Sequence, residues 1–217
     1  MRGLFRDNGL SIVLIVLFIA FWALQAITGW SVFNEEQKEH GGQILGFGSY
    51  LVSAHFLEAT AENWESEFLQ MGMYVFLTVF LFQRGSAESK SPDKREDVDE
   101  VPRNPGPDAP GPVRKGGWIR TLYAYSLTLT FLALFLASFA VHAIGGAHLD
   151  NAERAAHGQP AQTVLEFMNS SQFWFEAMQN WQSEFLAVFS IVVLTIFLRQ
   201  KGSPESKPLA MPHKENP

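Results

Sequence analysis

The sequence contains no cysteine, which excludes disulfides, thiolate metal sites and cysteine nucleophiles. Basic residues are in the minority, with 16 Lys and Arg against 22 Asp and Glu, so the basic surface that binds nucleic acid is missing. The sequence also lacks a nucleophile elbow, a P-loop, a dinucleotide-binding fingerprint and a zincin motif. We therefore expect a protein that is not an enzyme, holds no cofactor and has no nucleic-acid partner.

Charge is absent from long stretches of the chain. Residues 10–29 and 122–146 carry no Asp, Glu, Lys or Arg, and each stretch can cross the roughly 30 Å hydrocarbon core of a bilayer at about 1.5 Å per residue. Two shorter uncharged blocks, 68–82 and 185–198, reach that length when each is counted from the tryptophan that precedes it. Because a chain inside a bilayer must satisfy its own backbone hydrogen bonds, we expect an all-α integral membrane four-helix bundle.

An internal repeat divides the chain. Shifted by 117 residues, Leu10–Lys90 aligns with Leu127–Lys207 without a gap, and about 30 of some 80 positions are identical. The identities include NWESEFL against NWQSEFL and RGSAESK against KGSPESK. Each copy holds two predicted spans, so both copies enter the membrane in the same orientation. The predicted bundle therefore consists of two tandem, parallel-orientation helical hairpins.

The predicted organisation has four parts. The first transmembrane hairpin repeat covers residues 1–84 and the second covers 118–201. The linker at 85–117 and the tail at 202–217 are rich in Pro, Gly and mixed charge, and such segments cannot bury a core. We expect both to be disordered.

The basic residues predict which side of the membrane each part occupies. Lys38 and Arg154 lie in the loops within the two hairpins, whereas the other basic residues lie with the two termini and the linker. By the positive-inside rule the termini and linker are cytoplasmic, in a multi-pass protein of the cell inner (plasma) membrane. The cytoplasmic set comprises Arg2, Arg6, Arg84, Lys90, Lys94, Arg95, Arg103, Arg114, Lys115, Arg120, Arg199, Lys201, Lys207 and Lys214.

The NWxSEFL segments carry the candidate site. Asn63, Ser66 and Glu67 lie at positions i, i+3 and i+4, so they share one helix face. A carboxylate that faces lipid one turn inside the membrane interface has a high free-energy cost. We therefore expect this face to point into the bundle. The remaining members of the predicted polar site are Asn180, Ser183 and Glu184 of the second copy, with Gln25 and His142 on the partner helices.

Two functions fit these polar residues. The first is a non-enzymatic structural or interaction module, in which the polar cluster fixes helix register and the partners are the lipid bilayer, a homo-oligomer or another membrane protein. The second is a small proton- or cation-conducting transporter or channel that uses Glu67 and Glu184. The sequence leaves both open.

A polar motif also recurs in the loops within the hairpins. Asn34 and Gly41 bracket a segment that returns at Asn151 to Gly158. Asn is a good helix N-cap, Glu suits a first turn, His a last turn, and Gly the position after a helix, so the motif predicts a short external helix. A metal site is the weaker alternative; its ligands would be Glu36, His40, Glu153 and His157.

Three segments carry a family resemblance: RDNGLSIV near the start, FLEATAENWESEFLQMG, and VFLTVFLFQRGSAESK. They resemble a family of small, uncharacterised bacterial membrane proteins catalogued as a domain of unknown function. The resemblance covers both hairpins and implies four helices in a bacterial inner membrane. It implies no activity.

Overall fold

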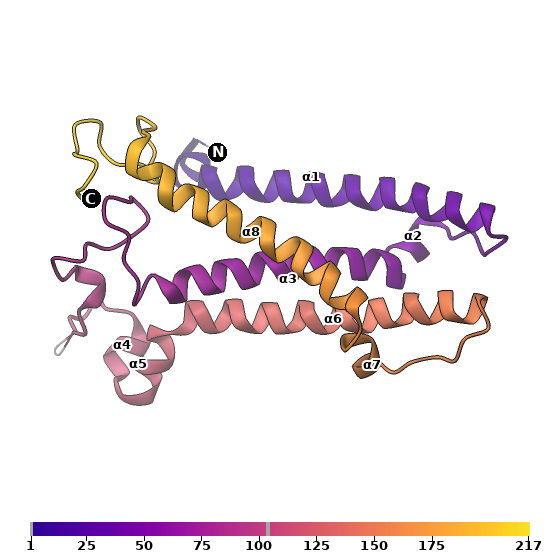
Figure 1. Ribbon diagram of the computed structural model, residues 1–217. Coiled ribbons are helices and arrows are strands. Elements are labelled where there is room, and N and C mark those ends of the chain that lie inside the picture. Colours follow the sequence, from indigo (N-terminus) through magenta and orange to yellow (C-terminus); the bar gives the residue numbers. More distant parts are fainter. Residues whose placement is uncertain (1, 103–104) are drawn as a thin grey trace. The chain divides into compact units, whose positions relative to one another are not determined.

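The computed structural model of the chain describes residues 2–102 and 105–217, and only the backbone of Arg2. Arg103, one of the predicted cytoplasmic cations, lies outside the described residues. The part that is described contains helices and no strand, which confirms the all-α prediction. Its elements (Figure 1) are α1 (Arg2–Glu39), α2 (Phe47–Tyr50), α3 (Ala54–Leu77), η1 (Asp97–Asp99), α4 (Gly111–Lys115), α5 (Gly117–Ala124), α6 (Ser126–Ala156), α7 (Val164–Met168) and α8 (Ser171–Phe197).

Three helices, α1, α6 and α8, are long and apolar enough to span a membrane. Their apolar side chains are largely uncovered by protein. On α1 the consecutive residues Leu14, Ile15 and Val16 are 56%, 50% and 58% exposed. Consecutive helix residues point in different directions, and a helix that is apolar around its circumference is typical of a membrane span. These helices indicate a membrane protein.

The α3 helix is shorter than its predicted span. We expected a helix through residue 82, but α3 ends at Leu77 and turns follow it. The Lys90 ammonium donates to the Val79 carbonyl oxygen at 3.3 Å, so a side chain replaces a bond that a further helical turn would have made. The acidic residues of α3, including Glu62 and Glu65, also set it apart from the three apolar helices. A fourth span stays a prediction.

The chain falls into two compact units. Unit 1 comprises Met1–Ala61 and Val141–Asn169, and unit 2 comprises Glu62–Ala140 and Ser170–Pro217. Unit 1 therefore holds α1, α2, α7, the start of α3 and the end of α6, whereas unit 2 holds η1, α4, α5, α8 and the rest of α3 and α6.

In unit 1, rings from the short helices pack against glycines of the long ones. Tyr50 of α2 is 1% exposed, and a Cβ added to Gly29 of α1 would lie 2.4 Å from its hydroxyl oxygen. Phe167 of α7 is 2% exposed, and a Cβ on Gly146 of α6 would lie 2.6 Å from its ring. Each loop thus inserts an aromatic ring where the long helix has no side chain.

The predicted short external helices are wrong. The α1 helix continues through Asn34, and α6 continues through Asn151, so neither residue is an N-cap. Instead, the Asn34 side chain accepts from the Leu45 N–H at 2.8 Å and donates to the Leu45 carbonyl at 2.9 Å. Asn151 makes the same two bonds with Gln162, at 2.7 and 2.8 Å. A carboxamide offers both a donor and an acceptor, so it pairs with the loop backbone as another backbone would.

Glycines end these two helices, as the sequence predicted. Gly41 follows α1 with φ +68° and Gly158 follows α6 with φ +67°. The Gly42 N–H donates to the Gln37 carbonyl at 2.7 Å, which closes a Schellman motif. The left-handed conformation at these positions favours glycine because it has no Cβ.

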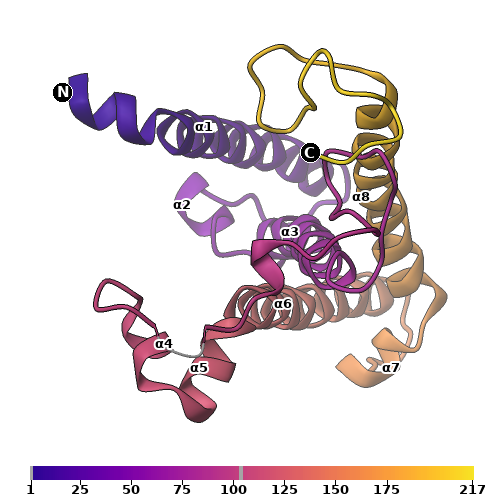
Figure 2. The ribbon, with the colours of Figure 1, turned by 90° about the vertical axis from the view of Figure 1, so that its left-hand side faces the viewer.

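The linker and tail make specific contacts in unit 2, where disorder was expected. Ser86 is fully buried and Lys207 is 2% exposed. The linker contains α4, which lies beside α5 (Figure 2), and α5 begins at the last residue of the linker, Gly117. In these contacts, serine hydroxyls and the Lys207 ammonium satisfy backbone groups of the loops. The disorder of the two segments stays a prediction.

Candidate functional site: the α3–α8 seam

The structure divides the predicted polar face of α3 between exposed and buried positions. Asn63 and Glu67 are exposed, whereas Ser66 is 2% exposed. The Ser66 hydroxyl donates to the Asn63 carbonyl at 2.8 Å, a bond within its own helix. Ser183 of α8 makes the matching bond to the Asn180 carbonyl at 2.8 Å. The two serine hydroxyls therefore bind backbone carbonyls of their own helices.

A neighbouring set of α3 residues makes the contacts with α8. The Asn180 amide donates to the Glu62 carboxylate at 2.5 Å, and the Trp181 indole N–H donates to the Glu65 carboxylate at 2.9 Å. The Gln70 amide donates to the Glu184 backbone carbonyl at 2.8 Å. We name this set the α3–α8 seam: Glu62, Glu65, Gln70, Asn180, Trp181 and Glu184.

Helical spacing places the two carboxylates of the seam together. Glu62 and Glu65 are three residues apart and share one face of α3, whereas Gln70 lies about 80° around the helix from Glu62, beside Ser66. Glu62 and Glu65 directly precede Asn63 and Ser66, and the prediction left them out because it relied on residues that are the same in 10–90 and in 127–207. Glu62 and Glu65 face Gln179 and Gln182 in the alignment, so they were passed over. The sequence signal that could have identified Glu62 and Glu65 was an acidic residue aligned with a glutamine.

Glu65 is the most enclosed member of the seam. It is fully buried, and its partner Trp181 is held by aromatic neighbours on two sides. Phe135 of α6 and Trp174 of α8 both meet Trp181 edge-on, with ring centroids 6.1 and 6.2 Å away. This packing fixes the direction of the indole N–H. Trp181 thus binds a carboxylate in a fixed direction.

The α3 and α6 helices also pack closely in unit 2. A Cβ on Gly72 would lie 3.1 Å from the Phe131 side chain, and Phe68 and Phe131 have ring centroids 6.5 Å apart. Beside them lies an apolar groove of about 240 Å³, lined by residues such as Met73 and Leu132. Packing of a small residue against a ring brings helices together without a hydrophobic driving force from water.

Gln25 and His142 belong to unit 1. Gln25 is half-buried in α1, and His142 is fully buried in α6. The His142 Nε2 lies 3.9 Å from a Glu58 carboxylate oxygen. Gly145 allows this approach, because a Cβ there would lie 2.7 Å from the Glu58 Cβ. Carboxylate and imidazole are metal ligands, yet this pair alone supplies an incomplete ligand set. Convergence of all four helices on one site stays a prediction.

The alternative metal ligands lie at the ends of the long helices. Glu36, His40, Glu153 and His157 are all exposed. The His40 and His157 Nδ1 atoms each lie 2.9 Å from the carbonyl oxygen of the glutamate four residues earlier. The imidazoles thus bind the last turn of their own helix, as a C-terminal histidine does. This arrangement favours helix capping over metal binding.

The seam can perform a limited chemistry. Its side chains are carboxylates, carboxamides and one indole, none of which is an activated nucleophile. The arrangement holds two helices together through charge-assisted hydrogen bonds.

Comparisons with known proteins identify a family and no activity. A search of curated proteins and a search of solved structures each found no match. A protein-family model described as "Domain of unknown function (DUF6766)" matches residues 1–216. The chain therefore belongs to the DUF6766 family.

Proposed function

We propose that the chain is a non-enzymatic, multi-pass membrane protein that acts as a structural or interaction module. Its four spans are α1, α3, α6 and α8, arranged as two tandem hairpins of the same orientation. The three apolar helices support the membrane location. The polar contacts of α3 with α8 support a fourth span, because they give the α3 carboxylates partners away from lipid.

One observation carries this proposal: fully buried Glu65 accepts a hydrogen bond from the Trp181 indole. A buried carboxylate is costly unless it is paired. The indole N–H can donate but cannot accept, so it holds the carboxylate without offering a route for a proton. The geometry therefore favours a contact that fixes helix register over a proton relay.

Transport through Glu67 and Glu184 has less support. Glu67 is exposed and Glu184 is half-buried, whereas the enclosed carboxylate is Glu65. A transport pathway requires ionisable groups that line a water-accessible route. We retain transport as the alternative that the following experiment tests.

Two double variants separate the functions. The seam variant carries Glu62→Gln and Glu65→Gln, and its thermal stability in detergent should differ from that of wild type. Wild-type protein in proteoliposomes should show no proton or cation flux. The matched control, Glu67→Gln with Glu184→Gln, should leave stability nearly unchanged. The proposal fails if wild-type protein dissipates an ion gradient and the Glu67/Glu184 variant, still folded, does not.

Sidedness has its own test. We propose that the linker and the 202–217 tail are cytoplasmic, supported by the distribution of basic residues. Single cysteines can report it, since the chain has none of its own. A membrane-impermeant maleimide should label Gln43→Cys and Gln159→Cys in intact cells and leave Lys94→Cys unlabelled. The reverse pattern would overturn the orientation.

A further inference from the structure

The 208–217 segment folds back within unit 2. Figures 1 and 2 show this yellow segment beside the magenta loop that follows α3. We name residues 83–89 the first serine loop. The segment and the loop are far apart in sequence. Two residues hold the segment in place: Lys207, which precedes it, and Asn216, which binds the loop.

The first anchor is Lys207. Its ammonium donates to the backbone carbonyls of Pro212, His213 and Glu215 at 3.1, 3.0 and 3.0 Å. An ammonium has three N–H donors, so all of them are used. Burial lowers the pKa of Lys207 from its ordinary value, and these carbonyls offset part of the cost of enclosing the charge. The segment therefore wraps around a lysine.

The second anchor is Asn216, which docks on the first serine loop. Its Oδ1 accepts from the Gly85 N–H at 3.0 Å. Its Nδ2 donates to the carbonyls of Gln83, Ser86 and Ser89 at 3.0, 3.1 and 2.9 Å. An amide nitrogen has two hydrogens, so one of them is shared between two carbonyls. Every polar atom of the carboxamide is engaged.

This arrangement selects asparagine. Aspartate would place a carboxylate against three carbonyl oxygens and would lose both donors. Gly85 is equally specific: it has φ +84°, and a Cβ there would lie 2.0 Å from the His213 carbonyl oxygen. The loop backbone can approach the segment because position 85 has no side chain.

Serine side chains build the loop independently of the segment. The Ser89 hydroxyl accepts from the Gln83 N–H at 2.8 Å, and the Ser86 hydroxyl accepts from the Glu88 N–H at 3.1 Å. Ser86 also lies 3.1 Å from the Thr195 hydroxyl of α8. The carbonyls that receive Asn216 are therefore oriented by bonds other than those to Asn216. Such preorganisation lowers the entropic cost of binding.

We propose that the first serine loop is a binding site for a peptide segment that presents an asparagine carboxamide, occupied here in cis by residues 208–217. The bound segment joins the end of α3 to the end of α8, because Lys207 follows α8 and Asn216 reaches the loop after α3. This inference does not depend on the proposed function. It concerns the ends of the helices, whereas the seam lies along them.

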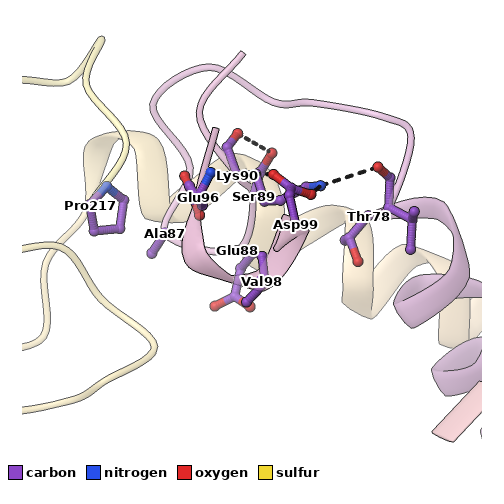
Figure 3. A pocket seen from close by; sticks show the side chains of 10 residues that line it. Thr78, Ala87, Glu88, Ser89, Lys90, Glu96, Val98, Asp99 and Pro217 are labelled. Carbon is purple, nitrogen blue, oxygen red and sulfur yellow. Dashed lines mark hydrogen bonds and ion pairs between the residues drawn. The ribbon is translucent and has the colours of Figure 1, made fainter. Parts of the chain in front are cut away.

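A crosslink in the full chain tests occupancy in cis. Ala87 and Pro217 line the same pocket of about 450 Å³ (Figure 3), so cysteines at both positions should be joined by a short bifunctional maleimide. Mass spectrometry should find the crosslink within one chain. Asn216→Asp should lower its yield by about tenfold, since it removes several hydrogen bonds. Lys214→Ala, at an exposed position of the same segment, should leave the yield unchanged.

Two results of this experiment would overturn the proposal. One is an equal crosslink yield in the wild-type background and in Asn216→Asp. The other is a crosslink that joins two chains, which would place the segment in trans.

A peptide experiment tests the loop as a binding site. A labelled peptide with the sequence of residues 208–217 should bind the Asn216→Asp chain in detergent and should bind the wild-type chain, whose site is occupied, about tenfold more weakly. The same peptide with Asp in place of Asn is the control. Equal binding of the two peptides, or no binding to the Asn216→Asp chain, would refute recognition of the carboxamide.

Discussion

Residues 10–90 and 127–207 agree at their turns and differ along their second helices. Asn34 and Asn151 each pair with the backbone 11 residues later, with nearly equal distances. In contrast, α3 presents carboxylates to α8, and α8 answers with an amide and an indole. The turns hold each loop on its own helix and can be the same in both segments. Two helices that bind each other need complementary groups. Glu62 and Glu65 of α3 accept from α8, and Gln70 of α3 donates to it.

The largest expected effect comes from breaking the donor side of the seam. Trp181→Phe keeps an aromatic ring and removes the donor to the buried Glu65 carboxylate. Thermal or denaturant unfolding in detergent should show a loss of about 2–3 kcal/mol, the size of a hydrogen bond to a charged group. Trp118→Phe, at a 75% exposed position of α5, is the control and should cost much less. Similar losses for both variants would mean that ring size matters and the hydrogen bond does not.

The next effect tests whether the two turns are equivalent. Gly29→Ala and Gly146→Ala should each cost about 1–2 kcal/mol, since overpacking against a buried ring outweighs the gain in helix propensity. Adding Tyr50→Phe to Gly29→Ala should restore part of the loss, because the hydroxyl oxygen is the atom nearest the new Cβ. If both glycine variants unfold like wild type, the rings do not need these glycines.

A smaller effect is expected at the paired asparagines. Asn34→Ala and Asn151→Ala each remove two hydrogen bonds to a loop, and each should cost about 1 kcal/mol. Hydrogen exchange should rise at Leu45 in the first variant and at Gln162 in the second. Markedly unequal costs would show that the two turns share a geometry without sharing a role.

The smallest effect is a dependence on pH at the first serine loop. Burial raises the pKa of the Glu88 carboxyl, the Tyr74 hydroxyl opposes this by donating to it at 2.8 Å, and Glu205 raises it further. The folded state therefore holds this proton more tightly than the unfolded state. Its contribution to stability is present below the unfolded pKa and is lost as pH rises through the folded pKa.

Glu88→Gln should remove this dependence. At each pH, the unfolding midpoint of the variant is compared with that of wild type. The increase in the variant's midpoint over wild type should be largest near neutral pH and smallest in acid. Asp93 and Asp99 have lowered pKa values, through hydrogen bonds from Arg84 and Lys90 respectively, and act in the opposite direction in both proteins. A difference between variant and wild type that does not change with pH would contradict the assignment to Glu88.

The long helices and their ends were predictable because their signals are local. Uncharged runs predicted α1, α6 and α8, and single glycines marked the ends of α1 and α6. The partners of side chains were not predictable. Asn is a residue type that favours helix N-caps, yet the Asn34 side chain binds a loop. Glu65 was missed because the residue aligned with it, Gln182, is uncharged. Lys207 and Asn216 bind backbone carbonyls, and composition cannot show such contacts.

The rings seated on glycines set limits on how the chain length can vary. Tyr50 follows Gly29 by 21 residues, and Phe167 follows Gly146 by the same 21. One inserted residue within a long helix between these partners would turn the glycine by about 100° and shift it by about 1.5 Å. The ring would then meet a side chain. Insertions and deletions should therefore accumulate in the linker and be rare inside these two intervals. The fixed spacing of 21 residues can then be used to align further members of the family.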